Sequence, residues 1–236
     1  MLTLEAVSVT YNHRRQAVGA LADVSLQIAD GDFVSVVGPS GSGKSTLLLT
    51  LGGMLSPSAG RVLLDGESVY DLPSDQRARL RRKKLGFVFQ TFNLVPYLTA
   101  LENVQAPLFL AGLGDREQQE RAAALLERVG LGDRLDHKPS ELSVGQQQRV
   151  ALARVLANDP AIILADEPTG NLDPDTAQQV IVFLEEFSRE GRTLVMVTHD
   201  PQAARRAKRK LSLRAGKIAS EEEQEAGEPR RGSSCG

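Results

Sequence analysis

The sequence predicts an α/β fold with a mainly parallel sheet, an N-terminal antiparallel β subdomain and a helical insertion near the middle of the chain. A buried, β-branched strand at Phe33–Val37 runs directly into a glycine-rich turn and a helical segment. Beyond Gln90 the apolar spacing becomes helical. The succession of Ile162–Leu164, Thr176–Arg189 and Thr193–Val197 is a β-α-β unit, whose two strands should be parallel.

The N-terminal third contains mostly strand patterns. Apolar and polar residues alternate in Leu2–Thr10 and Val24–Ile28, as in half-buried strands. The other elements predicted before residue 90 are a helix at Thr46–Leu51, a strand at Arg61–Leu64 entering a turn at Asp65-Gly66, a charged helix at Asp75–Lys84 with Ser74 as its N-cap, and a strand at Leu85–Phe89.

The helical insertion is predicted over residues 91–155, with helices at Leu101–Leu110 and Arg116–Val129. One domain is expected to span residues 1–219. Ser220–Gly236 is first acidic and then rich in Pro, Arg, Gly and Ser, so we expect a disordered tail there.

Bulk composition excludes several classes of protein. The net charge of −2 gives no global basic field, so no nucleic-acid partner is expected. A single cysteine, Cys235, excludes a disulfide framework and favours a reducing compartment. No apolar run reaches the roughly 18–20 residues that span a bilayer, so we expect any membrane contact to go through a partner.

A phosphate-binding loop lies between the predicted strand Phe33–Val37 and the helix that follows it. Gly38–Ser45 fits the pattern G-x-x-x-x-G-K-[ST], whose backbone N–H groups cradle phosphate oxygens at a helix N-terminus. Lys44 should reach the β- and γ-phosphates, and Ser45 should bind Mg²⁺. This context predicts a P-loop NTPase core, and the loop alone leaves kinases, GTPases and motor ATPases open. If the nucleotide is ATP, the residues expected to bind it are Gly38, Pro39, Ser40, Gly41, Ser42, Gly43, Lys44, Ser45 and Thr46.

A pair of carboxylates ends the buried strand that begins at Ile162. Asp166 is in the position where P-loop proteins hold Mg²⁺, and Glu167 can polarise the attacking water as a general base. Alternatively, Asp166 and Glu167 are simply solvated charges at the end of a strand. The upstream phosphate loop favours their roles as metal ligand and general base.

A second glycine turn, Leu142–Gln146, precedes a helix predicted over Gln147–Ala157 and is a second potential anion site. This turn resembles the signature loop of ATP-binding cassette (ABC) ATPases, usually Leu-Ser-Gly-Gly-Gln. In that family the loop closes over the ATP held by the other subunit of a head-to-tail dimer. The resemblance covers about residues 2–218.

The resemblance implies roles for further residues, each weak as a signal by itself and specific in combination and order. Tyr11 would stack on adenine, Gln90 would touch Mg²⁺ and the attacking water, and His199 would contact the γ-phosphate. In the signature loop Ser143, Gly145 and Gln146 would face the partner's ATP, and Asn171-Leu172-Asp173 would cross to the opposite subunit. The catalytic set is thus Glu167, His199 and Gln90, and the metal set is Ser45, Gln90 and Asp166.

The signature loop departs from the family pattern at Val144, which replaces its first glycine. A β-branched residue does not adopt φ > 0 in practice, so we expect a negative φ here and retained activity.

Within the family, the stretches Gly86–Gln90, Phe92–Leu94 and Asp166–Asp173 resemble the branch of macrolide-export, lipoprotein-releasing and cell-division ATPases. The resemblance implies an ATP-hydrolysing subunit that powers export or mechanotransmission through a separate integral-membrane permease. Such a subunit is cytoplasmic, peripheral on the inner face of the cell membrane, and forms an ATP-sandwich homodimer. The alternatives are a soluble ABC ATPase not tied to transport and a nucleotide-dependent scaffold without turnover.

The apolar residues just after Gln90 have two open interpretations. They either line a groove for the permease or form the core of the helical insertion. They are Phe92, Leu94, Val95, Tyr97 and Leu98.

Overall fold

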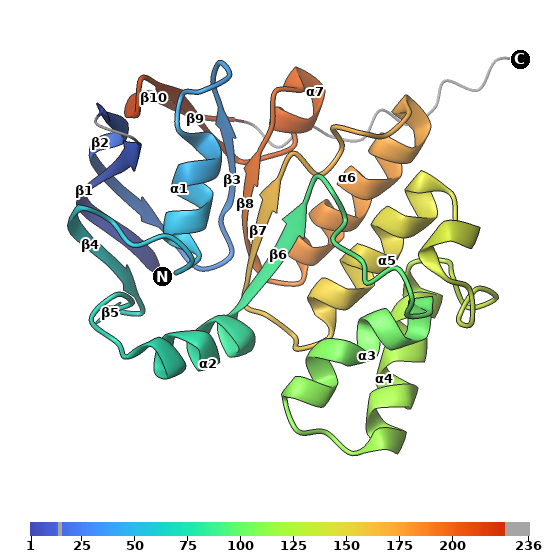
Figure 1. The fold of residues 1–236 in the computed structure, drawn as a ribbon. Coiled ribbons are helices and arrows are strands. Elements are labelled where there is room, and N and C mark those ends of the chain that lie inside the picture. Colours follow the sequence, from blue (N-terminus) through green and yellow to red (C-terminus); the bar gives the residue numbers. More distant parts are fainter. Residues whose placement is uncertain (14–15, 225–236) are drawn as a thin grey trace, which may run out of the picture.

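The computed structural model describes residues 1–13 and 16–224 and contains two sheets and a helical region (Figure 1). The smaller sheet has the order β2-β1-β4-β5 and is antiparallel. Its strands are β1 (Leu2–His13), β2 (Gln16–Ile28), β4 (Ala59–Leu64) and β5 (Glu67–Ser68). The predicted N-terminal antiparallel subdomain is confirmed.

The larger sheet has the order β10-β9-β3-β8-β7-β6. Strands β6, β7, β8, β3 and β9 are parallel, and only β10 is antiparallel to its neighbour. The bounds are β3 Phe33–Val37, β6 Leu85–Phe89, β7 Ile162–Asp166, β8 Thr193–Val197, β9 Arg209–Arg214 and β10 Lys217–Glu223. The mainly parallel sheet and the parallel pairing of β7 with β8 agree with the sequence prediction.

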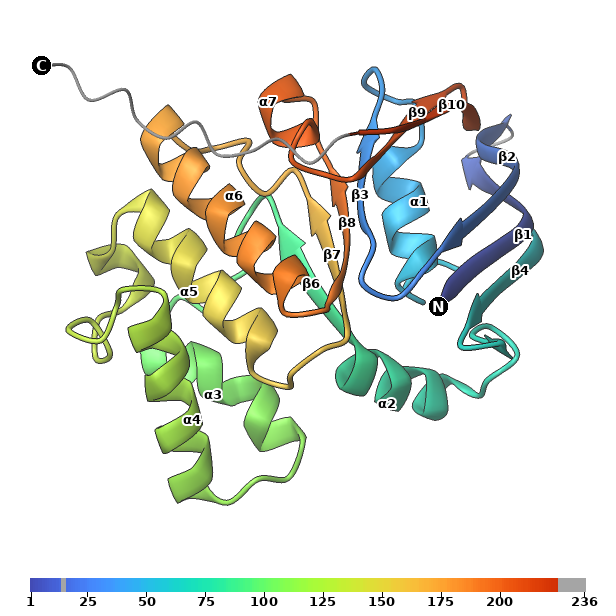
Figure 2. The same ribbon diagram turned by 180° about the vertical axis from the view of Figure 1, so that it is seen from behind.

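Helices cover both faces of this sheet (Figures 1 and 2). Helix α1 (Lys44–Leu51) packs between the two sheets, where Leu47 and Leu51 share a core with Val34 and Leu164. The opposite face carries α5 (Val144–Leu156) and α6 (Pro174–Arg189), which pack on the alternate strand residues, such as Ile163. This two-sided burial explains why the strands are apolar at nearly every position.

The helical region consists of α3 (Ala100–Leu110), α4 (Asp115–Arg128), the 3₁₀ turn Pro139–Glu141 and α5. It has its own core, in which Val104 of α3, Leu126 of α4 and Val150 of α5 are fully buried. Two shorter helices complete the fold, α2 (Ser74–Lys84) and α7 (Pro201–Ala204).

Several predicted boundaries are wrong. Strand β2 begins at Gln16, not Val24, and β1 continues to His13, beyond the predicted Thr10, because the two strands pair along their whole length. Helix α5 begins at Val144, not Gln147, because the Ser143 and Gln146 side chains cap its first turn reciprocally. Helix α2 begins at Ser74, so Pro73 precedes it as the N-cap residue. Strand β10 continues to Glu223, within the expected tail, because ion pairs from Lys210 and Arg209 on β9 hold its acidic residues. The tail from residue 225 onward lies outside the described residues.

Candidate active site

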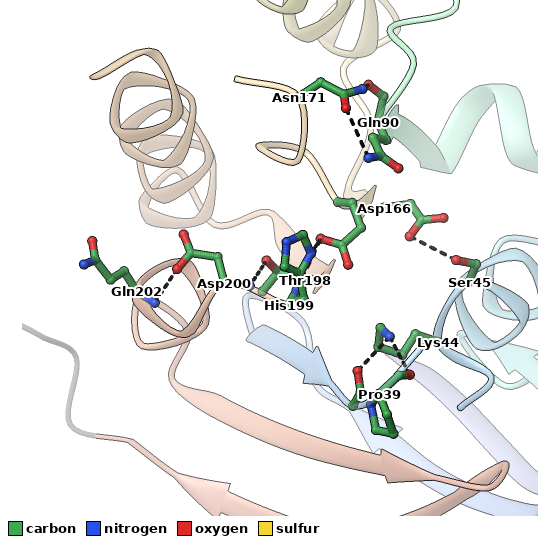
Figure 3. Close-up of polar contacts among 12 residues, drawn as sticks. Pro39, Lys44, Ser45, Gln90, Asp166, Asn171, Thr198, His199, Asp200 and Gln202 are labelled. Atoms are coloured by element: carbon green, nitrogen blue, oxygen red, sulfur yellow. Dashed lines mark hydrogen bonds and ion pairs between the residues drawn. The ribbon is translucent and has the colours of Figure 1, made fainter. Parts of the chain in front are cut away.

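Four neighbouring parallel strands end at the candidate site. Their carboxyl ends carry the loop after β3, Gln90 after β6, Asp166 at the end of β7 and His199 just beyond β8. Ligands of open α/β sheets bind at this edge of the strands. In Figure 3 the side chains of Lys44, Ser45, Asp166 and His199 lie around one common space.

The phosphate loop ends at Gly43, which has φ 102° and precedes the first turn of α1. A Cβ atom at Gly43 would lie 2.4 Å from the Ala20 carbonyl oxygen, so only glycine fits. Because glycine has no side chain to cap the helix, the first N–H groups of α1 are available to an anion.

Lys44 folds back over this loop. Its Nζ donates hydrogen bonds to the carbonyl oxygens of Gly38 at 2.8 Å and Pro39 at 3.0 Å. An ammonium group has three donors, so one remains for a phosphate oxygen. Free backbone donors and a lysine in one loop fit the phosphates of a nucleotide.

Ser45 and Asp166 form the second part of the site. The Ser45 hydroxyl donates to Oδ1 of Asp166 at 3.2 Å. Burial, together with the neighbouring Glu167 carboxylate, raises the pKa of Asp166 above its ordinary value, and the Ser45 bond and Lys44 oppose this shift. A cation would favour the ionised form, and these oxygen donors suit Mg²⁺, so the residues fit the expected metal.

Glu167 and His199 form the third part. The Glu167 carboxylate accepts from Nδ1 of His199 at 2.8 Å and from the His199 backbone N–H at 3.2 Å. The Glu167 side chain is 17% exposed, so it is largely shielded from water but still accessible to it. The arrangement leaves a carboxylate oriented and partly desolvated beside the phosphate loop.

Tyr11 lies over the loop from the smaller sheet. Its hydroxyl is 3.2 Å from Oγ1 of Thr46, and the side chain is 42% exposed. A ring anchored at its tip and open on its flank can stack on a planar group.

Gln90 adopts a different contact from the one expected. Its Nε2 donates to Oδ1 of Asn171 at 3.4 Å, and Nδ2 of Asn171 donates back to the Gln90 carbonyl oxygen at 3.1 Å. In Figure 3 a dashed line joins Gln90 with Asn171, and none joins Gln90 to Ser45 or Asp166. No sequence pattern predicts this link, whose only signal is the amide type at both positions.

The predicted signature residues form a separate group. Ser143 is the N-cap of α5, where its hydroxyl accepts from the Gln146 N–H at 3.2 Å and Oε1 of Gln146 accepts from the Ser143 N–H at 2.9 Å. Asp173 caps α6 in the same way and accepts from the Thr176 N–H at 3.1 Å, which lowers its pKa. Among residues 1–13 and 16–224, no hydrogen bond joins Ser143–Gln146 to Gly38–Ser45.

The sequence profile of the ABC transporter family matches residues 21–170. The chain belongs to this family. A Thermotoga maritima protein described as an uncharacterized ABC transporter ATP-binding protein is 50% identical over 201 residues, which are 85% of this chain and 86% of that protein. The chain is therefore an ATPase cassette of the ABC transporter type.

Longer relatives also match this cassette. The macrolide export ATP-binding/permease protein MacB of Syntrophobacter fumaroxidans is 49% identical over 224 residues, which are 94% of this chain and 31% of that protein. The chain thus spans about a third of the length of these MacB relatives. Among the described residues, the cassette has no helix long and apolar enough to cross a membrane.

Solved ABC cassettes share the fold. The dimeric cassette MJ0796 in a post-hydrolysis state bound to ADP and Pi is 44% identical, with a TM-score of 0.89 over 95% of this chain and 99% of that one. A second dimeric structure of MJ0796 gives the same TM-score at 45% identity.

Proposed function

We propose that this chain is the ATP-hydrolysing subunit that powers an integral-membrane permease, through export or mechanotransmission. One observation carries the proposal: Lys44, Ser45, Asp166, Glu167 and His199 converge at the carboxyl ends of adjacent strands. Hydrolysis of ATP needs positioning and charge neutralisation more than covalent help, and these residues provide both.

Each residue has a distinct part in the proposed mechanism. Lys44 exchanges its carbonyl partners for the β- and γ-phosphate oxygens. Ser45 and Asp166 would hold Mg²⁺, which would supply charge neutralisation on the phosphates. Glu167 accepts a proton from the attacking water, and His199 keeps the carboxylate aimed at that water.

Gln90 is proposed to join the metal and water after exchanging its bond with Asn171. The signature residues Ser143, Gly145 and Gln146 are proposed to act on the ATP of a second copy, and Asp173 to lie at the same interface. The assembly would work at the inner face of the cell membrane. A soluble ABC ATPase remains the alternative, and co-purification of a permease with this chain would exclude it.

The direct test is phosphate release by the purified chain with ATP and Mg²⁺. Glu167→Gln keeps the shape and an acceptor for His199 but removes the base, so turnover should fall roughly 10²-fold or more while ATP still binds. Phosphate release at the wild-type rate from Glu167→Gln would reject Glu167 as the base.

A further inference from the structure

Helix α2 is the most basic element of the chain. Six of its eleven residues are Arg or Lys and one is acidic, in a protein whose net charge is −2. No residue of α2 is buried. Positive charge is therefore concentrated on one exposed helix.

Some of these cations attach α2 to the body of the protein. Arg77 lies over the ring of Tyr70 at 5.4 Å, Arg81 donates to the Gly53 carbonyl oxygen at 3.0 Å, and Lys84 pairs with Asp65 at 3.5 Å. These contacts fix the orientation of the helix, so its outer face is set by the fold.

The outer face carries Arg79, Arg82 and Lys83, which are exposed and spaced three and four residues apart. Within the described part of the chain, Arg79 and Lys83 make no hydrogen bond or ion pair, and Arg82 donates only to the Leu110 carbonyl oxygen. Asp75 lies one turn before Arg79 and accepts from Ser74. Arg79 and Lys83 are thus free to meet anions, and the Arg82 guanidinium has further N–H donors besides the one bonded to Leu110.

The bond from Arg82 brings α2 to the C-terminal end of α3, where two large apolar side chains face solvent. Phe109 is 69% exposed and Leu110 is 64% exposed. Figure 1 shows α2 and this end of α3 at the same end of the molecule. Cations beside exposed apolar side chains are the composition of a surface that binds at a lipid interface.

The nucleotide site does not account for this surface. Strand β6 follows α2 directly and ends beside Gln90, so α2 lies at the opposite edge of the sheet. The five residues of β6 separate the end of α2 from Gln90 by about 16 Å. The phosphates of a nucleotide bound at Lys44 are out of reach of Arg79 and Lys83.

We propose that α2 binds the anionic headgroups of a phospholipid surface through Arg79, Arg82 and Lys83, with Phe109 and Leu110 entering the interface. The inference rests on the proposed function only in that work with a permease keeps this chain beside a bilayer. It departs from the expectation that membrane contact goes only through a partner, because α2 itself would bind the lipid. Charge complementarity and the adjacent apolar pair favour lipid over an acidic protein. Each cation near an anionic surface improves partitioning by roughly fivefold, and three together by about a hundredfold.

The test is co-sedimentation of the purified chain with vesicles of phosphatidylcholine, with or without phosphatidylglycerol. We expect binding only to vesicles with phosphatidylglycerol and loss of binding at high salt. The triple variant Arg79→Gln, Arg82→Gln, Lys83→Gln should bind about a hundredfold more weakly. Glutamine is a good helix former, so α2 should persist, and thermal unfolding checks this.

The matched control removes the same charge elsewhere. Arg205, Lys208 and Arg214 are exposed: the first two lie between α7 and β9, and Arg214 is the last residue of β9. Their triple change to Gln should leave vesicle binding nearly intact. Equal loss in both triple variants would show a net-charge effect and overturn the proposal.

Two other results also overturn the proposal. One is equal binding of the wild-type chain to neutral and anionic vesicles. The other is absence of binding to any vesicle. Binding of the wild-type chain to polyglutamate is then measured as well, and binding that is lost in the Arg79→Gln, Arg82→Gln, Lys83→Gln variant would indicate an acidic protein partner instead of lipid. Phosphate release is measured separately and should be unchanged in both variants, so failure of lipid binding and failure of the proposed ATPase function are distinguishable.

Discussion

At the scale of single residues, Glu167 has an unusual backbone. Its φ is 48°, a region that is unfavourable for side chains other than glycine and costs of order 1–3 kcal/mol. The conformation is held by the Glu167 N–H donating to Val197 and by the carboxylate contact with His199. The fold thus fixes the direction in which the proposed base points.

Asp166 gives a prediction about stability and pH. Because its pKa is raised in the fold, the carboxyl group stabilises the protein most at low pH, and this contribution is lost as the pH rises through the folded-state pKa. Asp166→Asn should therefore unfold at a higher temperature than wild type at pH 7 without nucleotide.

The difference between Asp166→Asn and wild type should shrink as the pH falls through the folded-state pKa of Asp166, because the wild-type carboxyl then becomes neutral as well. The variant should at the same time lose Mg²⁺-dependent nucleotide binding. A lower Tm for Asp166→Asn than for wild type at pH 7 would contradict the claim that burial of the ionised Asp166 carboxylate destabilises the fold.

Tyr11 gives a prediction about affinity. Stacking of an aromatic ring on a base is worth about 1–3 kcal/mol, so Tyr11→Ala should weaken ATP binding by up to about a hundredfold. Tyr11→Phe loses only the exposed contact with Thr46 and should change little. Titration with a fluorescent nucleotide measures both, and unchanged affinity in Tyr11→Ala would mean that the ring is structural.

At the scale of elements, the signature loop is the first turn of a helix. Val144 occupies the first position of α5, is 49% exposed and does not have a positive φ, as the sequence analysis expected. A branched residue fits at a helical φ, so the substitution of the family glycine leaves the N-terminus of α5 intact. Ser143 and Gln146 then present the anion-binding end of the helix at the surface.

The cap of α5 gives a prediction about stability. Replacing an N-cap serine by alanine costs about 1 kcal/mol, whereas glycine costs only a few tenths. Ser143→Ala should therefore lower Tm by roughly 2–4 °C without nucleotide, and Ser143→Gly by much less. Equal losses in calorimetry would mean that the hydroxyl does not cap the helix.

Most elements were predictable because their signals are local. Buried strands such as Leu85–Phe89 match the structure at both ends, and the phosphate loop needs only glycines, a lysine and a helix. Strand β9 was missed, and β10 overlaps the expected tail, because their residues pair through cross-strand ion pairs such as Lys210–Glu222 at 2.6 Å. Such pairing depends on a partner strand that composition does not reveal.

The residues of the candidate site were predictable from local motifs, but the contacts between distant loops were not. The order of the strands brings Ser45 and Asp166 together although 121 residues separate them. The bond between Gln90 and Asn171 depends on how two loops meet, which no pattern encodes. The apolar residues after Gln90 divide between the two expectations, since Leu94 packs on the helical core and Tyr97 is 73% exposed.

At the scale of the whole molecule, the chain presents two helix N-termini that can bind anions, one on each face of the sheet. Helix α1 carries the phosphate loop and packs with the smaller sheet, whereas α5 carries the signature residues on the opposite face. A nucleotide in the phosphate loop needs only one of them. We infer that the second serves the ATP of another copy, as in a head-to-tail dimer.

A variant at Val144 tests this inference better than one at Gly145. A Cβ atom at Gly145 would lie 2.4 Å from Cγ2 of Thr176, so any substitution there disturbs the chain itself. Val144 is exposed, and aspartate is favourable at the first turn of a helix. The matched control is Val144→Asn, because an asparagine side chain has nearly the same shape as an aspartate side chain and carries no charge.

The most direct measurement is light scattering of the Glu167→Gln protein with ATP, in which the closed dimer should accumulate. Adding Val144→Asp introduces a negative charge between Ser143 and Gly145, which are proposed to face the partner's γ-phosphate, and like charges repel, so ATP-induced dimers should disappear. Adding Val144→Asn should leave them. ATP affinity at low protein concentration should be unchanged in both and reduced only by Lys44→Ala. Persistent dimers in Val144→Asp, or monomer affinity lowered as much as by Lys44→Ala, would contradict a site shared between two copies.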